Sequence, residues 1–222
     1  AGLHKRGYRI EDVAAPMKET LAAALVQLSF YRADKELVDT CSGSGTIPIE
    51  AAMIERNIAP GLGRRFASDE WDFIPAETWK DERAKAYGAA DYDKELNIRG
   101  YDVNRKAVAA SNANAEEAGV SEDMEFFHMS MEKFNPETEY GVVISNLPYG
   151  IRVGTDPEIQ KIYEKFKQLM ADNPTWSFFL ITSDKELEKA LDRKADRRRK
   201  LYNGTIETQF YQFHGTKPKR KE

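Results

Sequence analysis

Cysteine is scarce in this sequence, and long apolar runs are absent. A single cysteine, Cys41, among 222 residues excludes an internal disulfide and fits a reducing, cytoplasmic setting. The longest purely apolar run, Leu21 to Val26, is far shorter than a membrane span, and the polar start shows no signal peptide. His4, His128 and His214 lie far apart and near no cysteine pair. We therefore expect a cytoplasmic protein that binds neither a metal nor a membrane.

The sequence also lacks an excess of positive charge. Its 33 Lys and Arg residues are outnumbered by 37 Asp and Glu residues, which gives a net charge of -4. A protein that grips nucleic acid over its whole surface is usually basic. The 41% of hydrophobic and 32% of charged residues are typical of a folded globular chain. The length fits a single domain over 1–222, large enough to bury about 70% of its unfolded surface.

Helical and strand patterns alternate along the chain. Such alternation predicts an α/β fold with a mainly parallel sheet. A helix is expected from Pro16, inside an N-terminal helical lead-in over 1–35. A hairpin is expected at the Asn203-Gly204 turn, so the last two strands are antiparallel. Strands are predicted at 37–39, 98–102, 124–129, 141–145, 176–182, 197–202 and 206–213.

Two further segments stand out. Residues 59–97 are rich in proline, glycine and aromatic residues, and they are predicted to be irregular. So many aromatic side chains indicate a packed insertion rather than a flexible linker. Residues 216–222 form a basic tail that we expect to fray.

A glycine-rich turn follows the strand at 37–39. Asp39, Cys41, Gly43, Gly45 and Thr46 line up between this strand and a helix. Glycines let a ligand approach the backbone, and ligands of open α/β sheets sit beyond the carboxyl ends of strands. A dinucleotide fingerprint needs a third glycine at position 48, where the chain has proline. Asp39 can instead face a cationic amino group, which favours a cofactor that carries an amino acid, although an ordinary strand-to-helix turn is the alternative.

Polar groups also follow two later strands. Asp102 can accept hydrogen bonds from both hydroxyls of a ribose, or it is simply a solvated acid ahead of a helix. After the strand at 141–145, the Asn146 amide and the Leu147 carbonyl, held extended by Pro148, can accept both hydrogens of an exocyclic amine. Tyr149 offers a ring on which a base can stack. Alternatively, this tetrapeptide only opens a loop.

Together these motifs resemble the Rossmann-like S-adenosylmethionine-dependent methyltransferases that methylate amino groups. More narrowly, residues 3–9, 15–22, 41–52 and 146–150 resemble the 23S rRNA guanine-N2-methyltransferases, in which a THUMP domain precedes the catalytic domain. The resemblance implies an rRNA substrate and catalysis by Asn146, Leu147, Pro148 and Tyr149. It implies S-adenosylmethionine as cofactor, bound by Asp39, Cys41, Gly43, Gly45, Thr46, Asp102, Val103, Ser130, Met131 and Asn146.

Two departures from the family pattern keep other targets open. Leu147 stands where the family usually has proline, and Asn-Leu-Pro-Tyr also resembles the motif of rRNA adenine dimethyltransferases, although residues 150–154 favour guanine. Ser130 stands where an acid is often found. The alternatives are adenine-N6 methylation of rRNA or DNA, methylation of a protein glutamine, and a non-catalytic RNA-binding module. A Rossmann oxidoreductase is disfavoured by Pro48.

Three smaller features of the sequence also carry expectations. Cys41 is expected to be a packing residue rather than a nucleophile. The basic run over 193–200 either tracks phosphates or forms a solvated strand edge. The chain begins with Ala1, and its mild acidity fits a catalytic fragment whose RNA-gripping THUMP domain came before it.

Overall fold

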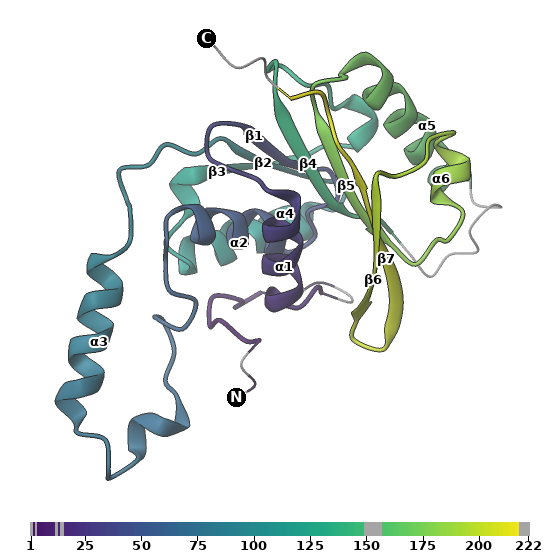
Figure 1. The fold of residues 1–222 in the computed structure, drawn as a ribbon. Helices are drawn as coiled ribbons and strands as arrows, with labels where there is room; N and C mark the ends of the chain where they lie inside the picture. The colour runs from purple at the N-terminus through teal and green to yellow at the C-terminus, as the bar shows by residue number, and fades with distance from the viewer. Residues whose placement is uncertain (1, 3, 12, 14–15, 149–156, 218–222) are drawn as a thin grey trace.

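A single twisted sheet of seven strands organises the part of the chain that the structure describes. The structure is a computed structural model, and it describes residues 2, 4–11, 13, 16–148 and 157–217. The strand order is β3-β2-β1-β4-β5-β7-β6 (Figure 1). Strands β1 to β5 are parallel, and β6 and β7 are antiparallel. The predicted fold class is therefore confirmed. The strands are β1 (Glu36–Asp39), β2 (Ile98–Asp102), β3 (Met124–His128), β4 (Gly141–Asn146), β5 (Ser177–Thr182), β6 (Arg197–Asn203) and β7 (Ile206–Phe213).

The strand order reverses beside β1. Leu37 of β1 lies in register with Ile98 of β2 on one side and with Val142 of β4 on the other. The chain therefore builds the sheet outward in one direction through β2 and β3, and then returns to build it in the other direction through β4 and β5. At such a reversal the connections leave the sheet on opposite faces, so a crevice opens beyond the carboxyl ends of the two central strands.

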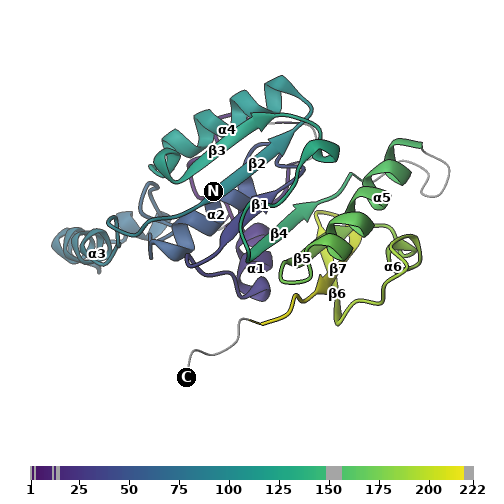
Figure 2. The same cartoon turned by 90° about the horizontal axis from the view of Figure 1, so that it is seen from above.

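Helices cover both faces of the sheet, as Figure 2 shows. Consecutive strand residues point to opposite faces, so Leu37 packs in one hydrophobic core and Val38 in the other. Strands buried on both faces must be apolar at every position, which explains runs such as 178–181. One face carries α1 (Glu19–Ser29), α2 (Thr46–Glu55) and α4 (Arg105–Glu117), and the other carries α5 (Pro157–Asp172) and α6 (Leu187–Ala190).

Within the described residues of the N-terminal lead-in, the α-helix is α1, which corrects the prediction of a helix from Pro16. Lys18 still has an extended backbone, and the helix begins at Glu19. The Arg9 guanidinium donates a hydrogen bond to the Met17 carbonyl and so holds this stretch against the body. Tyr8 is buried, and its hydroxyl donates to Glu50 at 3.0 Å. Long-range polar contacts, which leave no periodic signal in the sequence, replace the first helical turn.

The insertion between α2 and β2 differs more from the prediction. It contains a 13-residue helix, α3 (Ala76–Gly88), and a short 3-10 helix, η1 (Ala67–Glu70). None of the α3 residues is buried, and α3 lies well away from the sheet (Figure 1). Apart from partly buried residues such as Trp79 and Ala86, α3 is largely polar, so helical periodicity is weak in its sequence.

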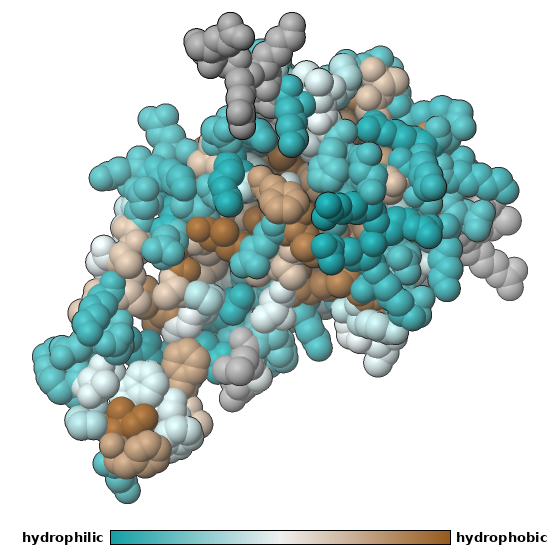
Figure 3. Space-filling view, in the orientation of Figure 1, coloured by the Kyte–Doolittle hydropathy of each residue, from teal (hydrophilic) through white to brown (hydrophobic). Residues whose placement is uncertain are grey.

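Several aromatic residues of the insertion are largely exposed. Trp71, Phe73, Tyr87 and Tyr92 are each more than half exposed. Trp71 and Phe73 stack on each other instead, with ring centroids 5.4 Å apart. Figure 3 shows apolar side chains gathered at the end of the insertion that lies farthest from the sheet. Trp71 and Phe73 thus pack on each other within the insertion.

The Gly141–Trp176 contact gives a test of the core. A Cβ on Gly141 would lie 2.4 Å from the indole of Trp176, which is 1% exposed and cannot retreat. We expect Gly141→Ala to lower the free energy of unfolding by about 1–3 kcal/mol. Urea unfolding would measure it. Gly88→Ala, where nothing lies within 4 Å, is the matched control and is expected to lose no stability. Equal midpoints for Gly141→Ala and the unsubstituted chain would contradict the packing described.

Candidate active site

The glycine turn after β1 depends on two left-handed residues. Gly43 has a φ of 55° and Gly45 a φ of 79°, values that side chains other than glycine rarely adopt. A Cβ on Gly45 would also lie 3.0 Å from the Phe126 ring and 3.2 Å from the Ser111 Cα. Gly45 caps α2, and Pro48 falls in the first turn of that helix, where no backbone donor is needed. The turn thus exposes its backbone at the head of α2.

Asp102 at the end of β2 clamps this turn. The Gly43 amide donates to Asp102 Oδ2 at 2.9 Å, and the Asn104 amide donates to Oδ1 at 2.8 Å. The Ser111 hydroxyl donates to the Gly43 carbonyl at 2.9 Å. A carboxylate has about four acceptor positions, so Asp102 can still receive hydroxyl donors from a ligand. The sequence indicated the ligand role of Asp102 but not its role in fixing the turn.

Asp39 is a buried carboxyl group with no cationic side chain within ion-pair distance among the described residues. Burial raises the pKa of Asp39 to about 7, and hydrogen bonds from the Cys41 amide and the Ser145 hydroxyl offset only part of that rise. Ser145 also ties β4 to β1, because the Thr40 amide donates to its hydroxyl at 2.8 Å. A ligand ammonium group beside Asp39 would favour its charged form.

Cys41 lies beside this carboxyl group and is partly buried. Burial raises the pKa of the Cys41 thiol, and the neighbouring Asp39 charge raises it further. The thiol is the nucleophile only in its ionised form. A packing role for Cys41 remains the prediction, and the electrostatics around it agree with that role.

Two adjoining cavities occupy the crevice. The first, which we call the turn pocket, has a volume of about 100 Å³. The second, the strand-end pocket, has a volume of about 430 Å³, and Cys41 lines both. Of the predicted site residues, the turn pocket is lined by Asp39, Cys41, Gly43, Thr46 and Asn146, and the strand-end pocket by Cys41, Asp102, Val103, Ser130, Met131 and Pro148. The tertiary structure therefore brings most of the predicted residues to one place.

Among the described residues, two predicted site residues do not line these pockets. Gly45 caps α2 rather than facing the cavity. Leu147 is 1% exposed, and its side chain belongs to the hydrophobic core while its amide donates to the Ile181 carbonyl. Only the Leu147 backbone is therefore available for chemistry. Tyr149 lies outside the described residues.

Asn146 presents an unsatisfied acceptor in the wall of the turn pocket. Its Oδ1 atom is buried and has no hydrogen-bond partner among the described residues. A buried amide oxygen without a partner costs roughly 1–3 kcal/mol, so such atoms are uncommon in folded proteins. A ligand that brings a donor to Asn146 would remove this cost.

The sequence missed several residues of the pocket walls. Ser130 accepts a hydrogen bond from the Glu132 amide at 3.3 Å, and this contact helps place the Glu132 carboxylate at the strand-end pocket. In the sequence, Glu132 is marked only by its position two residues after Ser130. The first turns of α5 contribute Glu158, Ile159, Lys161 and Ile162, and the chain before α1 contributes Val13, Pro16 and Met17. No motif marks these residues, because they reach the site only through the packing of distant segments.

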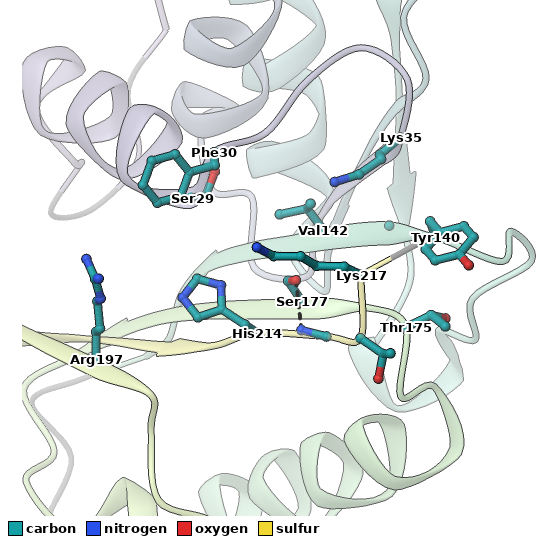
Figure 4. A pocket seen from close by; sticks show the side chains of 13 residues that line it. Ser29, Phe30, Lys35, Tyr140, Val142, Thr175, Ser177, Arg197, His214 and Lys217 are labelled. Carbon is teal, nitrogen blue, oxygen red and sulfur yellow. Dashed lines mark hydrogen bonds between the residues drawn. The ribbon is translucent and has the colours of Figure 1, made fainter. Parts of the chain in front are cut away.

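A further pocket lies at the opposite, amino-terminal edge of the parallel strands. It has a volume of about 510 Å³, and its lining includes Phe30, Lys35, Arg197, His214 and Lys217 (Figure 4). None of the predicted site residues lines it. The basic strand β6 beside it behaves largely as a solvated edge, since Arg198 pairs with Glu188 and Lys200 with Glu207.

Comparison with known proteins identifies the family. Residues 6–212 match the family described as the RMKL-like methyltransferase domain. The chain belongs to this family. It is therefore a methyltransferase domain, and its Rossmann-like sheet has the architecture expected for that class.

Curated relatives of this RMKL-like domain are longer proteins. YpsC of Bacillus subtilis, described as a candidate RNA methyltransferase, is 43% identical over 222 residues, which are 100% of this chain and 58% of YpsC. Ribosomal RNA large subunit methyltransferase K/L of Shewanella pealeana is 39% identical over 229 residues, 98% of this chain and 32% of that protein. The chain thus spans between a third and three fifths of these relatives.

Solved structures agree closely with the fold. SMU.472, a methyltransferase candidate crystallised with SAH, superposes with a TM-score of 0.91 at 42% identity over 98% of this chain and 57% of its own. A Listeria monocytogenes protein described as a predicted N6-adenine-specific DNA methylase gives 0.90 at 42% identity over 97% of this chain and 56% of its own.

Two kinds of feature are absent from the described residues. No group of three or more His, Cys, Asp or Glu side chains there is placed to hold a metal ion. Within the same residues, no helix combines the length and the apolar character that crossing a bilayer requires.

The raised pKa of Asp39 predicts a pH-dependent stability. Between about pH 4 and pH 7 the folded chain keeps a proton on Asp39 that the unfolded chain releases, so this group makes the fold less stable as pH rises. Asp39→Asn removes that penalty. Its stability relative to the unsubstituted chain should rise by on the order of a few kcal/mol from pH 4.5 to pH 7.5, measured by urea unfolding.

Asp172→Asn is the control for this test, because it removes an exposed carboxylate at the end of α5. If the stability difference produced by Asp39→Asn is the same at both pH values, Asp39 does not titrate in this range.

Proposed function

We propose that this domain transfers a methyl group from S-adenosylmethionine to the exocyclic N2 amine of a guanine in RNA, with 23S rRNA as the substrate. The observation that carries the proposal is the unpartnered, buried Asn146 Oδ1 in the same pocket wall as the Asp39 and Gly43 turn. The Asn146 amide oxygen, which can accept a hydrogen bond from an amine, thus lies beside Asp39 and Gly43, which suit a cofactor that carries an amino acid. The rRNA methyltransferase relatives support the choice of RNA.

The pockets fit the predicted cofactor. In our proposal Asp39 holds the ammonium group, Asp102 accepts the ribose hydroxyls with its remaining lone pairs, and the Gly43 backbone allows close approach. The apolar walls at Val103 and Met131 suit an adenine ring. The demethylated form of this cofactor, SAH, is the ligand of SMU.472. When bound, S-adenosylmethionine supplies a methyl group that is already activated by its sulfonium centre.

The protein then has to orient a weak nucleophile. The amine of guanine conjugates with its ring, and acceptors at Asn146 Oδ1 and the Leu147 carbonyl would favour the pyramidal nitrogen. They would also stabilise the positive charge that develops there. Alignment in a fixed site supplies much of the rate. The nitrogen loses its proton readily after methylation, so no strong base is needed. Tyr149, which the structure does not describe, is proposed from the sequence alone to stack on the base.

Adenine-N6 methylation is the second candidate. It is favoured by the Asn146-Leu147-Pro148-Tyr149 tetrapeptide, in which Leu147 replaces the usual proline. The description of the Listeria monocytogenes protein as an N6-adenine-specific DNA methylase points the same way. Both candidates use the same acceptors, since each target is an exocyclic amine on a purine. The difference between them lies in how the base ring is held.

Two wider proposals follow from the predicted family. We propose that RNA capture relies on a THUMP domain of the kind that precedes the catalytic domain in the family that the sequence resembles, and the greater length of the relatives supports this. A cytoplasmic location suits a ribosomal substrate and remains a prediction of the sequence.

Mass spectrometry of rRNA nucleosides tests the proposed target. We expect N2-methylguanosine to fall by one residue per 23S rRNA when the gene is disrupted and to return when it is restored. Loss of N6-methyladenosine instead would select the second candidate. Unchanged levels of both nucleosides would contradict both RNA targets.

Asn146→Ala tests the catalytic assignment. We expect cofactor affinity by calorimetry to stay near normal, while single-turnover methylation falls roughly a hundredfold, the scale of losing one oriented polar group. Asn112→Ala is the control, because Asn112 is exposed on α4 and binds only a carbonyl of its own helix. Unchanged turnover in Asn146→Ala would remove Asn146 from the mechanism.

A further inference from the structure

A strongly basic cavity lies next to the turn pocket. It has a volume of about 580 Å³. Among the described residues, its walls carry five Lys or Arg side chains and one histidine against a single carboxylate, in a chain whose net charge is -4. We call it the basic pocket. Its lining residues are His4, Lys5, Gly7, Arg9, Pro16, Lys18, Glu19, Arg64 and Arg65.

The one carboxylate of the basic pocket does not neutralise it. Glu19 is 4% exposed and lies 3.8 Å from the Arg9 guanidinium, so its charge is already paired. Lys5, Lys18 and Arg65 are exposed, and no described carboxylate forms an ion pair with any of them. The cationic side chains of Lys5, Lys18 and Arg65 are therefore accessible to solvent around one cavity. Such a concentration of positive charge attracts anions.

The basic pocket is held together by contacts between segments far apart in sequence. The Arg64 guanidinium donates to the Gly2 carbonyl at 3.0 Å and to the Lys5 carbonyl at 2.6 Å. It also lies over the Phe66 ring, 4.8 Å from the centroid. Arg83 of α3 in turn donates to the Arg64 carbonyl at 2.9 Å. The helix α3 thus helps to fix the position of Arg64 at the pocket.

The basic pocket adjoins the reaction centre. Pro16 lines both the basic pocket and the turn pocket. Arg9, in the wall of the basic pocket, donates to Thr46 Oγ1 at 3.0 Å, and Thr46 lines the turn pocket. A polyanion bound in the basic pocket would therefore lie next to the turn pocket, whose wall includes Asn146.

We propose that the basic pocket binds backbone phosphates of the RNA next to the target nucleotide; this rests on the function proposed above. Arginine and lysine neutralise phosphates, and such contacts set the position of a nucleic acid without reading its sequence. A phosphate anchored here holds the neighbouring base at the turn pocket. The mild acidity of the whole chain is then no obstacle, because the required positive charge is concentrated where the substrate enters.

A triple variant tests the basic pocket. Lys5→Ser, Lys18→Ser and Arg65→Ser remove three exposed charges and none of the proposed cofactor or amine contacts. The matched control removes three charges from the far-edge pocket of Figure 4 through Lys35→Ser, Arg197→Ser and Lys217→Ser. The readouts are cofactor affinity by calorimetry, and methyl transfer from tritiated S-adenosylmethionine to protein-free 23S rRNA at several salt concentrations.

We expect the triple variant to keep its cofactor affinity and its kcat within about twofold. Its KM for RNA should rise roughly tenfold or more, and the slope of log affinity against log salt should fall by about two, since each lost phosphate contact removes about 0.7–0.9. The control should change KM much less. If the triple variant does not fold, Arg65→Glu at an exposed position provides the same comparison.

The outcomes separate the two proposals. Active enzyme with unchanged KM and salt slope in the triple variant would overturn the basic pocket and leave the proposed function standing. An equal rise in KM for the control would also overturn it, since overall charge would then explain the effect. An unsubstituted protein that carries a THUMP domain ahead of this chain, and that binds the cofactor but neither binds nor methylates RNA, would overturn both.

Discussion

The pairing of β1 with β2 on one side and β4 on the other is the constraint on which the site depends. It places the carboxyl ends of three parallel strands side by side, so Asp39, Asp102 and Asn146, far apart in sequence, meet at one crevice. Hydrogen bonds then fix the geometry: the Gly43 amide binds Asp102, and the Thr40 amide binds Ser145. Because the strands are buried on both faces, they cannot slide without exposing one of the two cores.

The positions of the charged groups in this domain are more informative than its net charge. A carboxyl group is buried without a cation at Asp39, where a ligand ammonium would serve, and a buried acceptor waits at Asn146. Positive charge gathers around a neighbouring cavity, where Glu19, the one acid among the described lining residues, is already paired. The net charge of -4 conceals this separation, because a sum over the chain carries no information on where charges lie.

Much of the site could be predicted because its chemistry is local in sequence. The spacing of the glycines predicts the turn from Asp39 to Thr46. Asp102 and Asn146 each follow a strand that can be recognised from its run of apolar residues. The insertion was harder. Its helix α3 is largely polar, so apolar periodicity could not reveal it. Rings of the insertion stack in pairs, Phe66 on Trp79 and Trp71 on Phe73. The extended stretch before Glu19 depends on the long-range contact of Arg9 with Met17.

The sequence by itself determined the α/β fold, the glycine turn and the identity of the groups that we propose face the ligand, because strand burial, glycine conformation and functional-group chemistry are properties of short segments. Only the tertiary structure decided that Leu147 offers its backbone and not its side chain, that Asp102 clamps the turn, and that His4, Lys18 and Arg65 surround one cavity. These outcomes depend on which distant segments pack together, and packing is set by the whole core rather than by any one stretch of residues.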